Sequence, residues 1–125
     1  SDIRRFDHGT PSILAIAGSL PALLWSLAQD TQAALAHNRL LGGMLIDGAR
    51  DIGVKLVSPA EPAQRGGSVM LQVPAGTEPA LLVQAMRERD IWADCRGTTL
   101  RLSPGHVTTT DGVLRLLDLL AARRT

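Results

Sequence analysis

The chain has 125 residues, of which 45% are hydrophobic and 20% are charged, and its formal net charge at pH 7 is +1. This length and apolar content suffice for one modest core, and the balanced, dispersed charges argue against a nucleic-acid-binding surface. A single cysteine excludes an internal disulfide and a cysteine-based zinc site, and no apolar run reaches the length of a membrane span, so we expect a cytoplasmic protein without metal.

The N-terminal part is predicted to be helical. Residues 12–29 are rich in Ala, Leu and Ile, and Pro11 suits the start of a helix. Pro21 lies inside this segment and removes a backbone donor, which costs about 3 kcal/mol in a helix interior. We therefore expect a kink near residues 18–20, or two short helices in place of one.

A second helix is expected to follow. Asp30 or Thr31 can cap its start, it runs to about Ile52, and Gly53 suits a left-handed C-terminal cap. Its apolar stripe is broad enough to contact two neighbours, which favours an oligomer. The stripe consists of Leu40, Leu41, Met44, Leu45, Ile46 and Ile52.

The second half of the chain alternates short strands with helices. Gly97 is the predicted turn of a hairpin, and Thr109 or Thr110 starts the final helix. The order predicts an α+β fold, with a small antiparallel sheet covered on one face by helices and preceded by one or two N-terminal helices. We place the domains at 1–53 and 54–125. The expected strands are 55–57, 67–73, 91–94 and 98–102, and the expected helices are 78–89 and 112–122.

The segment Gly9-Thr10-Pro11 has the features of an anion site. Glycine lets the backbone approach a ligand closely, threonine offers a hydroxyl and an N–H donor, and proline opens the helix that follows. A helix start of this kind suits a phosphate group.

A second anion-binding site is predicted near the other end of the chain. We call Gly9 and Thr10 the phosphate grip and Arg101 the carboxylate grip. Arg101 stands between Leu100 and Leu102 in a strand-like run, so the leucines face one way and the guanidinium the other. A guanidinium so placed can bind a carboxylate with two parallel hydrogen bonds. A strand-surface arginine in a salt bridge is the alternative.

Taken together, these two segments resemble the C-terminal small domain of the class V aminotransferase superfamily of pyridoxal-phosphate enzymes. Gly-Thr-Pro before an apolar helix and a late Leu-Arg-Leu-Ser-Pro strand are marks of that superfamily, and the resemblance covers nearly the whole chain. Its middle is most similar to kynureninase, in Leu56 to Pro59, Arg65 to Leu71 and Asp94 to Arg96. The stretch after Pro104 departs from the kynureninase pattern, because it has neither the aromatic residue nor the asparagine that is usual there, so we expect a different wall on the substrate side.

The resemblance implies roles for three residues. Gly9 and Thr10 would bind the cofactor phosphate of a neighbouring subunit, and Arg101 would bind the carboxylate of a small amino-acid substrate. Pyridoxal phosphate is held by a lysine as a Schiff base, and in this superfamily that lysine lies upstream of Gly-Thr-Pro. The only lysine here, Lys55, lies downstream. We therefore expect no catalytic residue in this chain, a lysine-bearing large domain or partner chain, and a homodimer or hetero-oligomer.

Several alternatives remain open. The chain starts at Ser1 without a methionine, so we expect its start to be an internal cut or a processed end. The chain could be a cut piece, a subunit completed by a lysine-bearing partner, or a relic, and the rival function is a free-standing non-catalytic module that binds a small molecule or another protein. Cys95 keeps a cysteine desulfurase open, although its strand context favours a buried inert thiol. His8 and His106 lie close to the two grips and receive no role, and Arg96 either pairs with Asp94 or lines the pocket.

Overall fold

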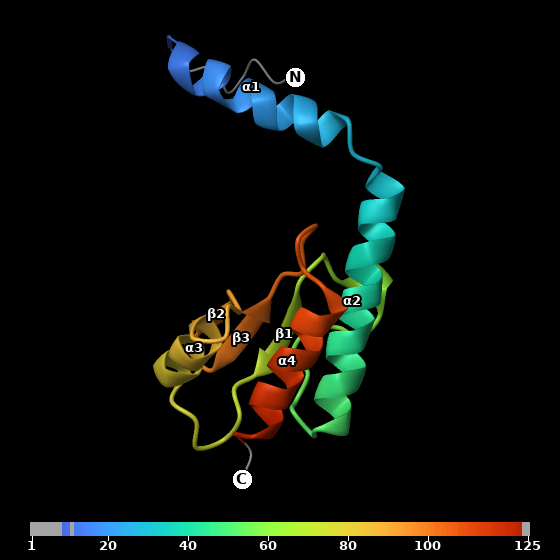
Figure 1. Ribbon diagram of the computed structural model, residues 1–125, viewed down its shortest axis with the longest axis vertical. Coiled ribbons are helices and arrows are strands. Elements are labelled where there is room, and N and C mark those ends of the chain that lie inside the picture. The colour runs from blue at the N-terminus through green and yellow to red at the C-terminus, as the bar shows by residue number, and fades with distance from the viewer. Residues whose placement is uncertain (1–8, 11, 124–125) are drawn as a thin grey trace. The chain divides into compact units, whose positions relative to one another are not determined.

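The computed structural model of the chain describes residues 9–10 and 12–123 (Figure 1). The chain divides into two compact units, Ser1–Thr31 and Gln32–Thr125. The predicted boundary after residue 53 separates the second helix from the sheet, whereas these units keep them together. In chain order the elements are α1 (Ile13–Leu27), α2 (Thr31–Asp51), a 3-10 turn η2 (Pro62–Gln64), β1 (Val69–Gln72), α3 (Pro79–Arg87), β2 (Asp94–Arg96), β3 (Thr99–Leu102) and α4 (Thr110–Ala121).

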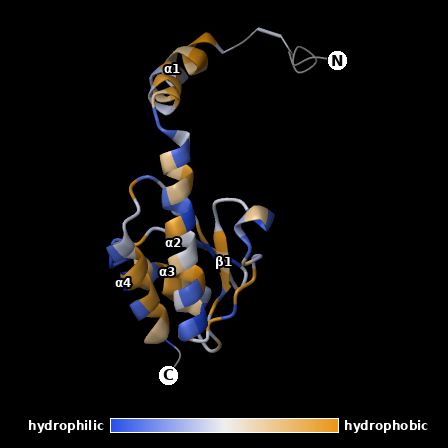
Figure 2. Cartoon of the chain, turned by 90° about the vertical axis from the view of Figure 1, so that its right-hand side faces the viewer, coloured by the Kyte–Doolittle hydropathy of each residue, from blue (hydrophilic) through white to orange (hydrophobic). Residues whose placement is uncertain are grey.

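Helix α1 is continuous through Pro21, so the predicted division into two helices is wrong. Proline withdraws one helical hydrogen bond, and the strong helix formers Ala and Leu on either side sustain the rest. The hydroxyl of Ser19 also donates to the carbonyl of Ile16 at 2.8 Å. None of the residues of α1 is buried, although Figure 2 shows apolar residues along most of the helix.

Helices α2 and α4 begin and end close to the predicted residues. The backbone at Gly53 has a φ of +64° directly after α2, as its predicted cap requires. At the start of α4 the hydroxyl of Thr109 accepts a hydrogen bond from the amide of Gly112 at 3.1 Å. The two helices pack closely, because a Cβ atom at Gly48 of α2 would overlap Leu117 of α4.

The three strands form an antiparallel sheet in the order β1-β3-β2, as the predicted fold class requires. Gly97, with a φ of +55°, stands in the two-residue turn between β2 and β3. The predicted strand 55–57 is reduced to one bridge, Leu56 to Leu71, since Pro59 soon ends the pairing.

Strand β2 starts three residues later than predicted. The amide of Ile91 donates to the carbonyl of Met86 at 2.9 Å, and Asp90 has a φ of +57°. These features extend the end of α3 into the region where the strand was expected, so pairing begins only at Asp94.

One core is formed by the helices α2, α3 and α4 together with one face of the sheet. In the stripe predicted for α2, Leu41, Leu45 and Ile46 are buried and Met44 and Ile52 pack against the core, but Leu40 is exposed. The residues that are almost fully buried include Leu41, Leu45, Leu71, Leu82, Met86, Leu100 and Leu120. The other face of the sheet carries no helix of the unit Gln32–Thr125, which leaves it open (Figure 1).

Within the described residues, no single helix is both long and apolar enough to cross a bilayer. Only α1 and α2 taken together reach the length and composition of such a segment, and a break separates them.

Candidate functional site

The candidate site lies on the open face of the sheet, where β3 presents Arg101. Its neighbours Leu100 and Leu102 are buried in the core, and the alternation of a strand therefore turns the Arg101 side chain to the opposite face. The side chain is 40% exposed. This is the placement that the sequence predicts, and it leaves the guanidinium accessible.

Arg101 forms a two-pronged ion pair with Asp94 of β2. The Nε atom of Arg101 donates to Oδ1 of Asp94 at 3.0 Å, and Nη2 donates to Oδ2 at 2.9 Å. A salt bridge is one of the two expectations stated above for Arg101, whereas the partner expected for Asp94 was Arg96. The partner is Arg101 because the two residues stand directly opposite each other in the antiparallel register.

The loop that follows β3 is tied to the rest of the unit by polar contacts that sequence reasoning missed. The side-chain amide of Asn38 in α2 donates to the carbonyls of Gly67, at 2.9 Å, and Pro104, at 3.0 Å. The hydroxyls of Ser68 and Ser103 are 2.8 Å apart. These contacts hold the end of the arginine strand in place. A helical Asn gives no sequence signal for such a role.

His37 in α2 makes a second contact of this kind, which was not predicted from the sequence. Its Nε2 atom donates to the carbonyl of Thr108 at 2.9 Å and so fixes the segment before α4. His106 lines a hollow of about 240 Å³ together with His37 and Asn38. His8 lies outside the described residues.

Cys95 points toward the core side of β2 rather than into an open loop. It is opposite Leu100 in the register and packs against the core. Burial raises the pKa of the thiol above its ordinary value of 9.0, and the nearby negative charge of Asp94 raises it further. A thiol with a raised pKa is mostly protonated at neutral pH and is a poor nucleophile.

The predicted phosphate grip lies in the other unit. Gly9 and Thr10 are both exposed, and Gly9 has a φ of +106°. Ser12 precedes the first turn of α1 without a side-chain cap, and the first turn, within the described residues, holds no acidic side chain. Among the described residues, the first amides of α1 therefore have no side-chain cap that would compete with a bound anion. Pro11 lies outside the described residues.

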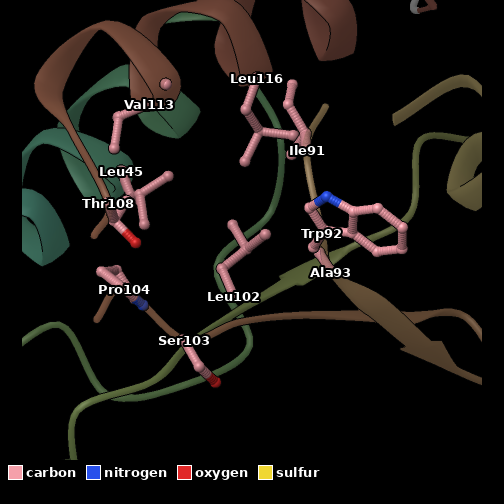
Figure 3. Close-up of a pocket in the computed structure, with 11 residues that line it drawn as sticks. Leu45, Ile91, Trp92, Ala93, Leu102, Ser103, Pro104, Thr108, Val113 and Leu116 are labelled. Atoms are coloured by element: carbon pink, nitrogen blue, oxygen red, sulfur yellow. The ribbon is translucent and has the colours of Figure 1, made fainter. Parts of the chain in front are cut away.

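An apolar cavity of about 80 Å³ opens on the helix side of the sheet (Figure 3). Leu102 lines it from β3, Val113 and Leu116 line it from α4, and the exposed Trp92 stands at its margin. Because Leu102 and Arg101 point to opposite faces of β3, this cavity is separate from the carboxylate grip. In the part of the chain that the structure describes, no group of side chains suits a metal ion.

Residues 31–120 match the family model of the kynureninase C-terminal domain. The fold is similar to a cysteine desulfurase from Thermococcus onnurineus NA1, with a TM-score of 0.81 at 17% identity over 98% of this chain and 34% of that chain. It is also similar to a NifS-like protein, with a TM-score of 0.73 at 16% identity over 92% of this chain and 34% of that chain. No curated protein sequence matches.

The chain therefore spans about a third of the length of these solved structures, and at this level of identity they bear on the fold alone. The family match covers most of the chain, including the Arg101 strand and the α2 helix that braces its loop. The chain belongs to the kynureninase C-terminal domain family, and it shares its fold with part of a cysteine desulfurase and of a NifS-like protein.

Proposed function

We propose that this chain supplies the substrate-carboxylate grip of a pyridoxal-phosphate enzyme that cleaves the side chain of a small amino acid by hydrolysis, as its family name suggests. The observation that carries the proposal is Arg101 on the open sheet face, in the segment that matches the family. Two buried leucines anchor the strand, so the guanidinium is held by a rigid element rather than by a loop.

The guanidinium has room for a substrate even while it contacts Asp94. That contact uses Nε and Nη2, and among the described residues no hydrogen bond or ion pair involves Nη1. The Nη1 and Nη2 hydrogens that point away from the arm can therefore bind the two oxygens of an α-carboxylate.

Gly9 and Thr10 fit the phosphate of the cofactor. Both are exposed next to a helix start that has neither a side-chain cap nor an acidic first turn, and this is the environment that favours a phosphate. Bound pyridoxal phosphate supplies an electron sink for bond cleavage at the amino acid. Thr10 would hold its phosphate in a neighbouring subunit and Arg101 would orient the substrate.

Lys55 does not fit the role of the cofactor lysine. It is an exposed residue directly before the Leu56 bridge, and its carbonyl accepts a hydrogen bond from the amide of Gln72 at 2.8 Å. We propose that the required lysine comes from a large domain or partner chain, in a dimer or larger assembly.

Cysteine desulfurase is the second candidate, since a solved structure of similar fold carries that name. Such an enzyme needs a reactive thiol, whereas Cys95 lies in a strand against the core with a raised pKa. The environment of Cys95 therefore favours the kynureninase-like function. A binding module without catalysis would also use Arg101, and the test below separates it by activity.

The test replaces Arg101 in the complete enzyme. Arg101→Ala should lower kcat/KM for the amino-acid substrate. The loss should correspond to on the order of 2–4 kcal/mol of transition-state stabilisation, the typical value of a lost charge-assisted contact. Arg101→Lys should be nearly as damaging, because a point charge cannot reproduce the planar fork.

The matched control is Arg96→Ala, which removes an exposed arginine from the neighbouring strand. It should change kcat/KM little. An unchanged kcat/KM in Arg101→Ala, or an equal loss in both variants, would show that Arg101 is not the grip. A well-folded complete protein with no cleavage activity would favour the binding module.

A further inference from the structure

The contact between Arg101 and Asp94 has a specific geometry. Asp94 binds the side edge of the guanidinium, through Nε and Nη2, at 3.0 Å and 2.9 Å. A planar guanidinium held by two parallel hydrogen bonds cannot rotate about the end of its arm without breaking one of them. The contact therefore fixes the direction in which the free end of the fork points.

The backbone enforces this contact. Asp94 and Arg101 are direct cross-strand partners in the β2–β3 hairpin, and the tight turn at Gly97 sets their register. On the other side of Arg101, β1 places Met70 opposite it, and Met70 offers no charge. Asp94 is thus the acidic partner of Arg101 in its row of the sheet.

A contribution to folding stability does not explain the ion pair between Arg101 and Asp94. The side chains of Arg101 and Asp94 are 40% and 48% exposed, and ion pairs so exposed to water contribute little to folding. A long arginine side chain loses much rotamer freedom when it binds a ligand, and a contact that orders it beforehand lowers that cost of binding.

We propose that Asp94 is a positioning residue that orders the Arg101 guanidinium for the α-carboxylate of the substrate. This inference rests on the proposed function of Arg101. Asp94 occupies the side edge, the substrate takes the end of the fork, and Asp94 itself does not touch the reacting atoms. Asp94 would compete with the substrate instead if its carboxylate had to leave before the substrate could bind, and the two roles predict opposite effects of its removal.

The experiment measures ligand binding to the complete holoenzyme by calorimetry. The probes are L-alanine, the smallest common amino acid with a side-chain carbon and an α-carboxylate, and L-alaninamide, which lacks the negative charge. The variants are Asp94→Ala and Asp94→Asn, of which the second keeps the shape and one oxygen acceptor. Asp111→Ala is the control, because it breaks a similar exposed ion pair, 3.0 Å to Arg115, in α4 on the core side of the sheet.

We expect Asp94→Ala to weaken the binding of L-alanine by roughly three- to tenfold and to leave that of L-alaninamide unchanged. Asp94→Asn should fall between Asp94→Ala and the unaltered enzyme. In an Arg101→Ala background, Asp94→Ala should have no further effect, because the group that it orders is gone.

Tighter L-alanine binding in Asp94→Ala would make Asp94 a competitor and overturn the proposal. Equal losses for both probes would indicate a structural role, and no loss would indicate a surface pair only, so either result also overturns it. A failure of the proposed function looks different, since Arg101→Ala alone would then leave L-alanine binding unchanged.

Discussion

The unit Gln32–Thr125 and helix α1 differ in how far they bury their apolar side chains. In the larger unit, α4 buries Val113, Leu116, Leu117, Leu119 and Leu120 and turns its polar residues outward. Helix α1 buries nothing, and its apolar residues lie around most of its surface. The unit with Arg101 therefore has its own core, whereas the segment beside Gly9 and Thr10 carries apolar surface for which an interface is the expected use.

This comparison separates the two grips in physical terms. The proposed carboxylate grip, Arg101, lies on a sheet that helices of the same unit support. The phosphate grip stands at the start of a helix whose apolar surface suits a contact with a large domain or a second subunit, in keeping with the proposed action of Thr10 across an interface. The predictions below test this contrast.

The largest expected effect is on stability. Leu71→Ala removes a fully buried side chain of β1 and should lower the free energy of unfolding by about 2–5 kcal/mol. Leu14→Ala in α1, where Leu14 is 87% exposed, should change it by no more than about 0.5 kcal/mol. Urea denaturation of the chain, followed by circular dichroism, measures both. Similar losses in the two variants would mean that α1 shares a core with the sheet.

The next effect concerns cofactor binding. Thr10→Val in the complete enzyme removes a hydroxyl donor to phosphate, which is worth roughly 1.5–3 kcal/mol. The affinity for pyridoxal phosphate should fall about tenfold or more while the fold survives. Fluorescence titration of the apoenzyme with the cofactor measures the change.

Mixing subunits tests the action across the interface. A Thr10→Val subunit combined with a subunit that lacks the catalytic lysine should yield one intact site per heterodimer if Thr10 acts on its neighbour. If Thr10 acts within its own subunit, the mixture contains no intact site. Activity no better than that of either parent would rule out the cross-subunit role.

Much of the fold could be predicted because the local signals agree with it. Gly53 and Gly97 stand at positive φ, Thr109 caps α4, and the alternation around Arg101 separates buried from open positions. The limits of β2 could not be predicted, because they depend on how α3 ends at Asp90 and Ile91. The continuity of α1 through Pro21 was likewise decided by its neighbours.

The candidate site was predictable only in part. Alternation places Arg101 on the open face, but its pairing with Asp94 rather than with solvent depends on the register of two strands. The register was not read from the sequence, since the start of β2 was expected three residues too early. His37 and Asn38 bind the carbonyls of Thr108 and Pro104, which lie more than sixty positions away in the chain. No local sequence pattern predicts such contacts.

The smallest expected effect concerns the reactivity of the Cys95 thiol, in the unit Gln32–Thr125. Its raised pKa means that its reaction with iodoacetamide should be slower than that of free cysteine near pH 8, and that its rate should still rise with pH beyond 9, where the rate of free cysteine levels off. Asp94→Asn removes the second cause of the shift, so the pKa falls and the rate at pH 8 should increase by roughly two- to fivefold. Burial, the first cause, remains, and the rate should stay below that of free cysteine. Asp111→Asn, which removes a carboxylate from α4, serves as the control and should leave the rate unchanged. A thiol that reacts faster than free cysteine at neutral pH would contradict the inert environment of Cys95 and would favour the desulfurase function.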